Sequence, residues 1–427
     1  MNLKLIYTTF FTITFLLNTQ ACKAENIKQE SNQTLDLDDA LDLAMKNNHH
    51  IRSALATLPI AQANLIIAKY RPNPIFNSNG ELVKGGSLHP GELWQTFETG
   101  RKRYWRVEIA KENISKTELE ISKMMWEIHT KVHVGYADLA IGRELYNLAS
   151  ERVDFYESLF NSAEKRFKAG DLSKLELERT RIQLLTVKNE LSEFDGKLKK
   201  ANVEFNHLLG NEVKEEATIK NAETLIPSSK LESYPGISNI LDEALLKRLE
   251  IAILEKEYGI ARAQLKKAKS DRIPNLQLGA GAAMPSYHDN VWGPFYGAQF
   301  EIPLFNRKQG EIKQAKAQID YLEREEERIK HDISIDVINS VKDLEVREEQ
   351  LQRFQDELLA DSEDILKMIK IGYQKGKLSL TDVLNAEQAN RDLKQKYFES
   401  LYNYQFALAS LEYAVGVPLY GLTEKKL

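Results

Sequence analysis

Residues 101–168 read RKRYWRVEIA KENISKTELE ISKMMWEIHT KVHVGYADLA IGRELYNLAS ERVDFYESLF NSAEKRFK, a stretch without proline in which Gly135 and Gly142 are the only glycines. Proline and glycine are the residues that break helix interiors, so this stretch predicts one continuous helix. At a rise of about 1.5 Å per residue, that helix is roughly 100 Å long. Helices of such length are unusual in globular domains and indicate coiled-coil or tubular packing.

The chain repeats this plan. Early residues match later ones at a shift of 200, as Ile51 matches Ile251 and Pro74 matches Pro274. Further along the shift is 206, as for Gly170 and Gly376. Two constant registers with matching glycine and proline positions indicate an internal duplication. We expect a first structural repeat over 25–210, a polar join over 211–236 and a second structural repeat over 237–420.

Each repeat predicts a short helix, a second helix, a strand hairpin and a long antiparallel helix pair. The short helices are expected at 37–46 and 240–247, and the second helices at 51–69 and 251–269. The hairpins are expected at about 73–99 and 275–304, and the long helix pairs at 101–209 and 308–415. Prolines end the second helices, and a glycine marks the turn inside each helix pair.

The strand segments alternate between apolar and polar or small residues. In the last of them Tyr296, Ala298 and Phe300 fall on one face, while Gly297 and Gln299 fall on the other. An apolar outer face with a polar inner face is the pattern of an outer-membrane barrel, and aromatic residues suit its interfacial girdles. The candidates for these girdles are Trp94, Phe97, Trp292, Phe295 and Tyr296. A soluble four-stranded sheet that caps a helical rod is the alternative.

The amino terminus indicates export. Lys4 is followed by an apolar segment from Leu5 to Leu17, so residues 1–24 are interpreted as a signal peptide. Cys22, the single cysteine, is either a lipid-attachment residue or is removed by cleavage near Ala24. Beyond Leu17 no run of 18 apolar residues is found, so no transmembrane helix is expected. Residues 421–427 form a short tail.

Four strands cannot close a barrel, and an open sheet edge cannot face lipid. An exported chain of this kind therefore has to share its strands with other copies of itself. Three copies supply about twelve strands, which is within the range of known barrels.

Composition and motifs argue against several other functions. The net charge of -5 provides no basic face for a nucleic acid. No phosphate loop, catalytic triad or zinc cluster is found, so we expect neither an enzyme nor a cofactor. His129 and His133 have a helical spacing that can bind metal, and His49 and His50 are adjacent. Neither pair is accompanied by further ligands, so no metal site is predicted.

Five motifs carry a resemblance to a known family. Residues 97–103 (FETGRKR) and 302–310 (IPLFNRKQG) lead into the two long helices. Residues 166–173 (RFKAGDLS) and 372–379 (GYQKGKLS) form the two turns, and 381–386 (TDVLNA) follow the second turn. With these motifs in this order, the chain resembles the TolC-type outer-membrane efflux proteins, in particular the CzcC-like cation-efflux branch, from about residue 35 to residue 419.

The resemblance implies a mainly α fold with a small β part. It implies a homotrimer whose long coiled-coil helices form an α-barrel in the periplasm, with a shared 12-stranded β-barrel in outer-membrane lipid. It further implies a periplasmic adaptor and an inner-membrane pump of the RND type as partners. The adaptor would contact the turns at six tip residues, which are Phe167, Gly170, Leu172, Tyr373, Gly376 and Leu378.

Family members narrow the tube just after the second turn with carboxylates. Asp382 matches one such position, whereas Asn385 stands where the family has a second carboxylate. Glu176 is the equivalent of Asp382 in the first repeat, so it is a third candidate for this gate. A ring of like charges in a pore favours cations.

The expected function is a passive outer-membrane duct in a tripartite system that exports divalent heavy-metal cations. Drug efflux and type I protein secretion through the same kind of duct are alternatives, because the pump usually sets the substrate. A periplasmic coiled-coil adaptor is a further alternative, but adaptors have a single helical hairpin between β-rich domains.

Overall fold

The computed structural model describes residues 34–80, 88–211, 219–220, 222–225, 236–284, 291–374 and 377–418. The expected signal peptide, Cys22, Gly376 and the tail 421–427 lie outside these residues. All the elements below belong to the unit Leu35–Leu427.

The first half of the chain forms α2 (Leu37–Asn47), α3 (His49–Leu55), α4 (Thr57–Lys69), α5 (Lys102–Lys168) and α6 (Lys174–Leu209). The long helix predicted at 101–168 is confirmed, because α5 runs without a break for 67 residues. The single helix predicted at 51–69 is wrong, since it divides at Ala56 into α3 and α4. Pro59 lacks an N–H and its ring opposes the carbonyl of Leu55, so the helix cannot pass through this point unbroken.

The second half forms α7 (Ile237–Lys247), α8 (Leu249–Ser270), α9 (Gln309–Arg353), α10 (Leu359–Gln374) and α11 (Leu380–Val415). The continuous helix expected at the start of the second helix pair is interrupted by η4, a π-helical turn at Phe354–Leu358. No proline or glycine occurs in that turn, so the usual helix-breaking residues do not mark it. The two long helix pairs therefore differ, although both have the predicted antiparallel plan.

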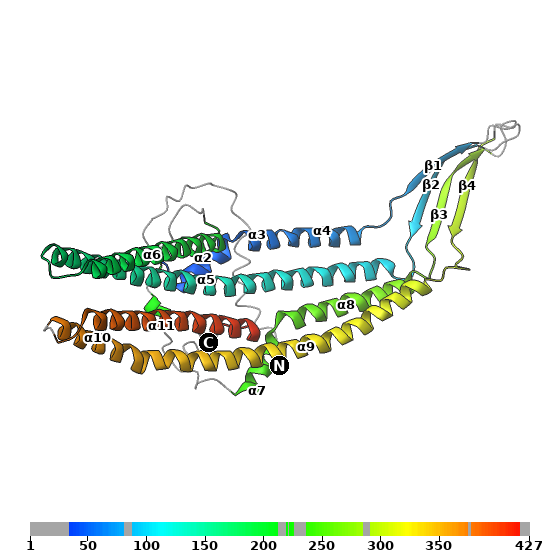
Figure 1. Cartoon of the computed structure of the whole chain (residues 1–427). Helices are drawn as coiled ribbons and strands as arrows, with labels where there is room; N and C mark the ends of the chain where they lie inside the picture. Colours follow the sequence, from blue (N-terminus) through cyan, green and yellow to red (C-terminus); the bar gives the residue numbers. More distant parts are fainter. Residues whose placement is uncertain are drawn as a thin grey trace. The chain divides into compact units, whose positions relative to one another are not determined.

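The long helices pack side by side in a fixed order (Figure 1). α4 and α6 pack along α5, α5 packs along α8 and α11, and these two pack along α9. The end of α6 meets the start of α3, where the Asn48 side chain donates to the Leu208 carbonyl at 2.7 Å. At the equivalent place in the second half, Arg248 donates to the Tyr413 carbonyl at 3.0 Å. The helix α3 thus continues the line of α6, and the helix α8 continues the line of α11.

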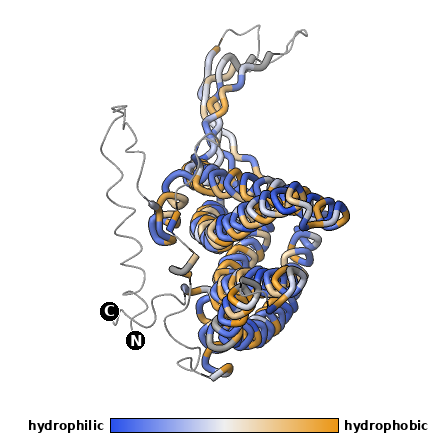
Figure 2. Tube along the Cα trace, turned by 60° about the vertical axis from the view of Figure 1, so that its left-hand side comes forward, coloured by the Kyte–Doolittle hydropathy of each residue, from blue (hydrophilic) through white to orange (hydrophobic). Residues whose placement is uncertain are grey.

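One face of this helical wall carries the main core. The short helices α2 and α7 pack there through Ala40, Ala44 and Ala244, which are completely buried. The 3-10 turn η2 (Ala222–Leu225) packs on the same core, and Leu35 pairs with Ile219 in an isolated bridge. Apolar and polar residues alternate along the long helices in Figure 2, as expected for helices with one packed and one solvated side.

The strands β1 (Ile75–Gly80), β2 (Leu88–Phe97), β3 (Leu276–Met284) and β4 (Gly293–Phe300) form one antiparallel sheet in the order β1-β2-β3-β4. The hairpins of the two halves are joined because β2 pairs with β3. β1 and β4 are the edges of this sheet.

The register separates the two faces of the sheet. Leu93, Ala280 and Tyr296 are paired neighbours on one face, and Trp94, Gly279 and Gly297 are paired neighbours on the other. The first face is mainly apolar, with Gln95 as its one large polar side chain among the paired residues. Six of its large apolar side chains are exposed, namely Phe76, Leu93, Phe97, Leu278, Tyr296 and Phe300, whereas Leu276 is half-buried and Met284 is buried. The alternation predicted for these strands is confirmed. Trp94 and Phe295 lie on the opposite face, so the prediction that they share an outward girdle with Phe97 and Tyr296 is wrong.

One described helical stretch, His49–Lys69, is long and apolar enough by length and composition to cross a membrane. The expectation that no such helix exists beyond Leu17 is therefore wrong by this measure. The stretch consists of α3 and α4, and much of its apolar surface is exposed, with Ile60 at 63% and Ile67 at 60%. A helix with this exposure has an apolar face that its own chain does not cover.

Candidate functional site

The two turns that join the long helices lie at the end of the wall opposite the sheet (Figure 1). In the first turn, Gly170 has a left-handed backbone with φ of 87°. Its N–H donates to the Phe167 carbonyl at 3.0 Å, and the N–H of Asp171 donates to the Arg166 carbonyl at 2.9 Å. This pair of bonds is a Schellman motif, which ends α5 and reverses the chain. Phe167 is 39% exposed and Leu172 is half-buried, so both present apolar surface at the tip.

Replacing Gly170 by alanine is expected to destabilise the first turn by about 1 kcal/mol, because a Cβ is disfavoured at a positive φ. The matched control is Gly196→Ala in the interior of α6, where an added Cβ meets nothing within 4 Å. That change is expected to stabilise the helix by roughly 0.5–1 kcal/mol. Thermal unfolding of the purified variants checks both signs, and a Gly170→Ala protein as stable as the parent would contradict the assignment.

The second turn shows the same reversal. The N–H of Lys377 donates to the Gly372 carbonyl at 2.9 Å, which is the bond that Asp171 makes in the first turn. Leu378 is 39% exposed and folds onto Gly372, where an added Cβ would lie 2.6 Å from its Cδ1 atom. Gly376 lies outside the described residues, as does the side chain of Tyr373.

Two of the gate candidates, Asp382 and Glu176, lie in the first turns of the returning helices, and Asn385 lies one turn further along α11. Asp382 accepts from the Ser379 N–H at 2.8 Å and Ser379 Oγ at 2.7 Å, while Glu176 accepts from the Ser173 N–H at 3.4 Å. Each pair forms a capping box, with Ser379 and Ser173 as the N-caps of α11 and α6. The bonds from the Ser379 side chain and backbone lower the pKa of Asp382. Asp382, Asn385 and Glu176 are all exposed.

This capping role was not predicted from the sequence. Its signal was present in the serine that precedes each carboxylate by three residues. The capping bonds fix both carboxylates at the amino-terminal ends of their helices, and they favour the ionised form of Asp382.

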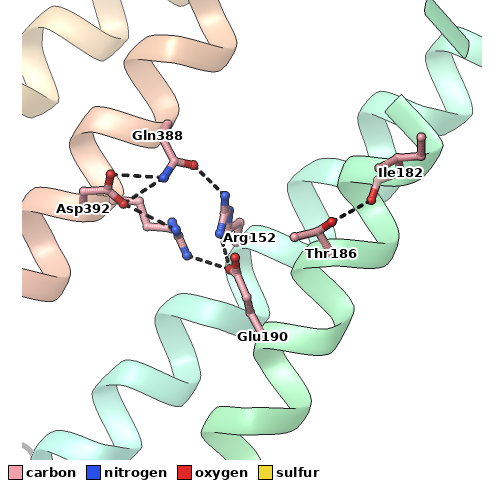
Figure 3. Close-up of polar contacts among 7 residues, drawn as sticks. Arg152, Ile182, Thr186, Glu190, Gln388 and Asp392 are labelled. Atoms are coloured by element: carbon pink, nitrogen blue, oxygen red, sulfur yellow. Dashed lines mark hydrogen bonds and ion pairs between the residues drawn. The ribbon is translucent and has the colours of Figure 1, made fainter. Parts of the chain in front are cut away.

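A polar cluster joins the two helix pairs above the tips (Figure 3). Arg152 on α5 pairs with Glu190 on α6, and its other terminal nitrogen donates to Gln388 of α11 at 2.7 Å. Arg391 of α11 donates to the same Glu190 carboxylate at 3.0 Å, and Gln388 donates to Asp392 at 3.0 Å. The side chains of Arg152 and Arg391 are only 8% and 11% exposed. Two buried guanidinium groups thus share one carboxylate between three helices.

No sequence motif marked this cluster. The repeat places Leu358 and Leu185 opposite Arg152 and Arg391, and Lys396 opposite Glu190. The two halves therefore differ in charge at the positions of the cluster. That difference was the only sign in the sequence of a specific contact at these positions. Closer to the tip, Leu384 of α11 packs against Val153, Tyr156 and Val187 of the first helix pair.

The face of the wall opposite α2 and η2 is hollowed. A cavity of about 910 Å³ is lined by residues of α5, α6, α9 and α11, among them Asp138, Glu204, Asp336 and Tyr402. Burial, and to a smaller extent the nearby Glu204, raise the pKa of Asp138. This face combines aromatic rings with carboxylates and lacks the covering helices of the other face.

The histidine pairs do not converge as metal ligands. His133 is buried between Glu412 and Gln405, at 3.1 and 3.0 Å from its two ring nitrogens. His129 stacks on Trp126 with ring centroids 4.7 Å apart, and burial lowers its pKa. His50 packs edge-on against His207. Within the described ranges, no group of three or more metal-binding side chains is found.

A sheet with one mainly apolar face, joined to helix pairs that end in paired turns, is the arrangement expected of outer-membrane efflux channels. The family model for outer membrane efflux proteins matches residues 40–211 and 240–417, so the chain belongs to that family. Both halves match the same model, which agrees with the internal duplication. The chain is accordingly a passive channel of the outer membrane and not an enzyme.

Known relatives extend over most of the chain. The cobalt-zinc-cadmium resistance protein CzcC of Cupriavidus metallidurans is 23% identical over 374 residues, which cover 86% of this chain and 87% of CzcC. The cation efflux system protein CusC of Escherichia coli is 23% identical over 399 residues, covering 87% and 84%. The crystal structure of the Campylobacter jejuni CmeC outer membrane channel matches with a TM-score of 0.75 at 17% identity, covering 94% and 93%. The predicted fold and efflux-channel class are confirmed.

Proposed function

We propose that the chain forms the outer-membrane duct of a tripartite system that exports heavy-metal cations. One combination of features chiefly supports the duct. A sheet with an exposed apolar face lies at one end of the helix pairs, and the longest of these helices has 67 residues. The metal substrate is supported by the relatives, since CzcC is named for cobalt, zinc and cadmium resistance and CusC for cation efflux.

Deletion of the gene tests the substrate. Tolerance to cobalt, zinc, cadmium, copper and silver salts is compared with tolerance to drugs, with the intact gene returned on a plasmid. We expect tolerance to at least one metal to fall several-fold and to be restored by the plasmid. Loss of drug tolerance alone would favour drug efflux, and loss of an exported protein alone would favour type I secretion through the same kind of duct.

The assembly is proposed to be a homotrimer. The α4 and α6 edge of the wall exposes an apolar stripe at helical spacing, formed by Ile60, Ile67, Leu175, Ile182 and Leu185. The α9 and α10 edge exposes another, formed by Tyr321, Ile335, Val346, Ile365 and Met368. Different stripes on opposite edges suit a heterologous contact, which closes into a ring when the rotation permits. Three copies would also join β4 of one copy to β1 of the next, giving twelve strands without an edge in lipid.

The partners are proposed to be a periplasmic adaptor and, beyond it, an inner-membrane pump of the RND type. Efflux channels receive their substrates from such partners, and the tips are the part of the chain farthest from the sheet. The apolar contacts would come from Phe167 and Leu172 on the first tip and from Leu378 and Tyr373 on the second. Gly170 and Gly376 would provide the chain reversals.

We also propose that the amino terminus directs export. Residues 1–24 would be the signal peptide, with Cys22 either lipidated or removed. Mass spectrometry of the mature protein distinguishes the two, because lipidation adds the mass of acyl chains to a chain that begins at Cys22, whereas simple cleavage leaves an unmodified amino terminus.

The gate is proposed to lie at the start of α11 and α6, where Asp382 and Glu176 would form a ring of negative charge in the trimer. The π-helical turn η4 would act as a hinge in the second helix pair, since such turns occur frequently at functional sites. The cluster around Glu190 would hold α11 against α5 and α6 while the gate is closed. The tip segments below the cluster would then move when an adaptor binds.

Charge at the gate is tested with substitutions that spare the helix cap. Asp382→Asn keeps an oxygen that can accept the Ser379 N–H, so it removes the charge alone, whereas Asp382→Ala removes the charge and the cap. We expect both to reduce block of the channel by divalent cations in planar bilayers. Asn385→Asp, which adds a carboxylate one turn further on, should increase that block. Equal block in all three variants and the parent would remove these positions from the gate.

A further inference from the structure

The inner face of the sheet holds an indole that lies flat across three strands. Trp94 is on β2, and it covers Gly279 on β3 and Gly297 on β4, its paired neighbours. A Cβ added at Gly279 would lie 2.5 Å from Cδ2 of the indole, and one added at Gly297 would lie 2.6 Å from Cη2. Real Cβ atoms do not come so close, so the ring occupies space that only glycine leaves free.

Two further contacts fix the ring in this recess. The indole N–H of Trp94 donates to the Glu92 carboxylate at 2.8 Å, and Glu92 is only 6% exposed. The Phe295 ring, on the same face, lies with its centroid 5.9 Å from that of Trp94. A buried tryptophan usually finds a partner for its N–H, and here that partner comes from the same strand. The indole is therefore held against the sheet and does not stand up from it.

The opposite face of the sheet is the one that suits lipid, because most of its large side chains are apolar and exposed. In the assembly proposed above, Trp94 then faces the interior of the duct, once per copy. A flat indole leaves the passage wide, whereas an upright one would project into it from each copy.

We infer that Trp94 sets the width of the duct at the level of the strands, and that Gly279, Gly297 and Glu92 are positioning residues that keep its ring against the wall. The inference rests on the proposed function, because it requires this face to line the passage. It assigns the size limit of the passage at this level to one side chain, separately from the gate at the helical tips.

The test measures entry from outside the cell, which does not depend on the gate at the other end. Cys22 is kept, because its lipidation or its removal leaves no free thiol, and Thr96, two residues beyond Trp94 on the same face and strand, is replaced by cysteine. A bulky, charged maleimide that cannot cross the membrane is added to intact cells, and its rate of reaction is recorded. We expect ready labelling when Trp94 lies flat, and several-fold slower labelling after Gly279→Ala or Gly297→Ala.

Two controls make the outcome specific. Gly293→Ala on β4 adds a Cβ that meets nothing within 4 Å, so labelling should not change. Trp94→Ala combined with Gly279→Ala should restore fast labelling, because the displaced indole is gone. Equal rates in all variants would overturn the role of Trp94. Labelling of cysteine at Leu93, on the apolar face, together with no labelling at Thr96 would instead overturn the orientation of the sheet and with it the proposed duct.

Discussion

Replacing Ile60 and Ile67 together by aspartate is expected to convert the assembly into monomers. The two side chains lie one above the other on α4, two turns apart, and are 63% and 60% exposed in the single chain. Burying an isoleucine against a neighbouring copy contributes about 1.5–3 kcal/mol, and a carboxylate in its place would have to be desolvated. Because the proposed trimer has this contact three times, the double change should remove the oligomer completely.

The measurement is migration on unheated gels, supported by the mass of the purified protein in detergent. Gln62→Asp is the matched control, because Gln62 is exposed on the same helix but does not belong to the apolar stripe. The control should remain oligomeric. An Ile60 and Ile67 double variant with the oligomeric mass of the parent would show that this edge of the wall is not the interface.

Replacing Glu190 by alanine is expected to open the helical end of the duct. The change leaves the buried Arg152 and Arg391 side by side without the carboxylate that they share. Breaking a buried ion pair costs about 3–5 kcal/mol, and the partial exposure of Glu190 reduces this to about 2 kcal/mol. A difference of that size shifts the ratio of closed to open channels by a factor of about 30.

Leak conductance in planar bilayers measures this shift. Glu190→Gln keeps hydrogen-bond acceptance and removes the charge, so its conductance should fall between those of the parent and Glu190→Ala. Thr186→Ala, one turn earlier on α6, removes only a hydroxyl bonded to the Ile182 carbonyl, and it should behave as the parent (Figure 3). Unchanged conductance in a Glu190→Ala protein that remains oligomeric would exclude the cluster from gating.

Much of the fold could be predicted from the sequence because long helices without proline and alternating strands leave strong periodic patterns. The duplication supplied each pattern twice, so the order of the main helices and strands and the antiparallel plan of both helix pairs could be predicted. Two breaks were missed for different reasons. The division at Ala56 follows from Pro59, which was present in the sequence but overlooked. The π-helical turn at 354–358 has no proline or glycine and depends on packing that the sequence does not display.

The two turns were predicted in position, whereas the gate and adaptor-contact roles of their residues stay predictions. Gly170 could be identified as a turn residue because a backbone with positive φ favours glycine, and glycine is visible in the sequence. The second role of Asp382 and Glu176 as capping residues was missed, although each has its serine three residues earlier. The ion cluster around Glu190 could not have been found from spacing, since its members come from three helices. Trp94 was assigned to the wrong face of the sheet because the alternation is weakest in the first hairpin.

A density map of the purified protein in lipid nanodiscs tests most directly whether this chain forms a shared duct. The expected result is three copies around one axis, with β4 of each copy paired to β1 of the next in a closed barrel of twelve strands, and with the apolar face of the sheet against lipid. Trp94 should then face the interior. A monomer, or an assembly in which β1 and β4 remain unpaired edges, would contradict the duct.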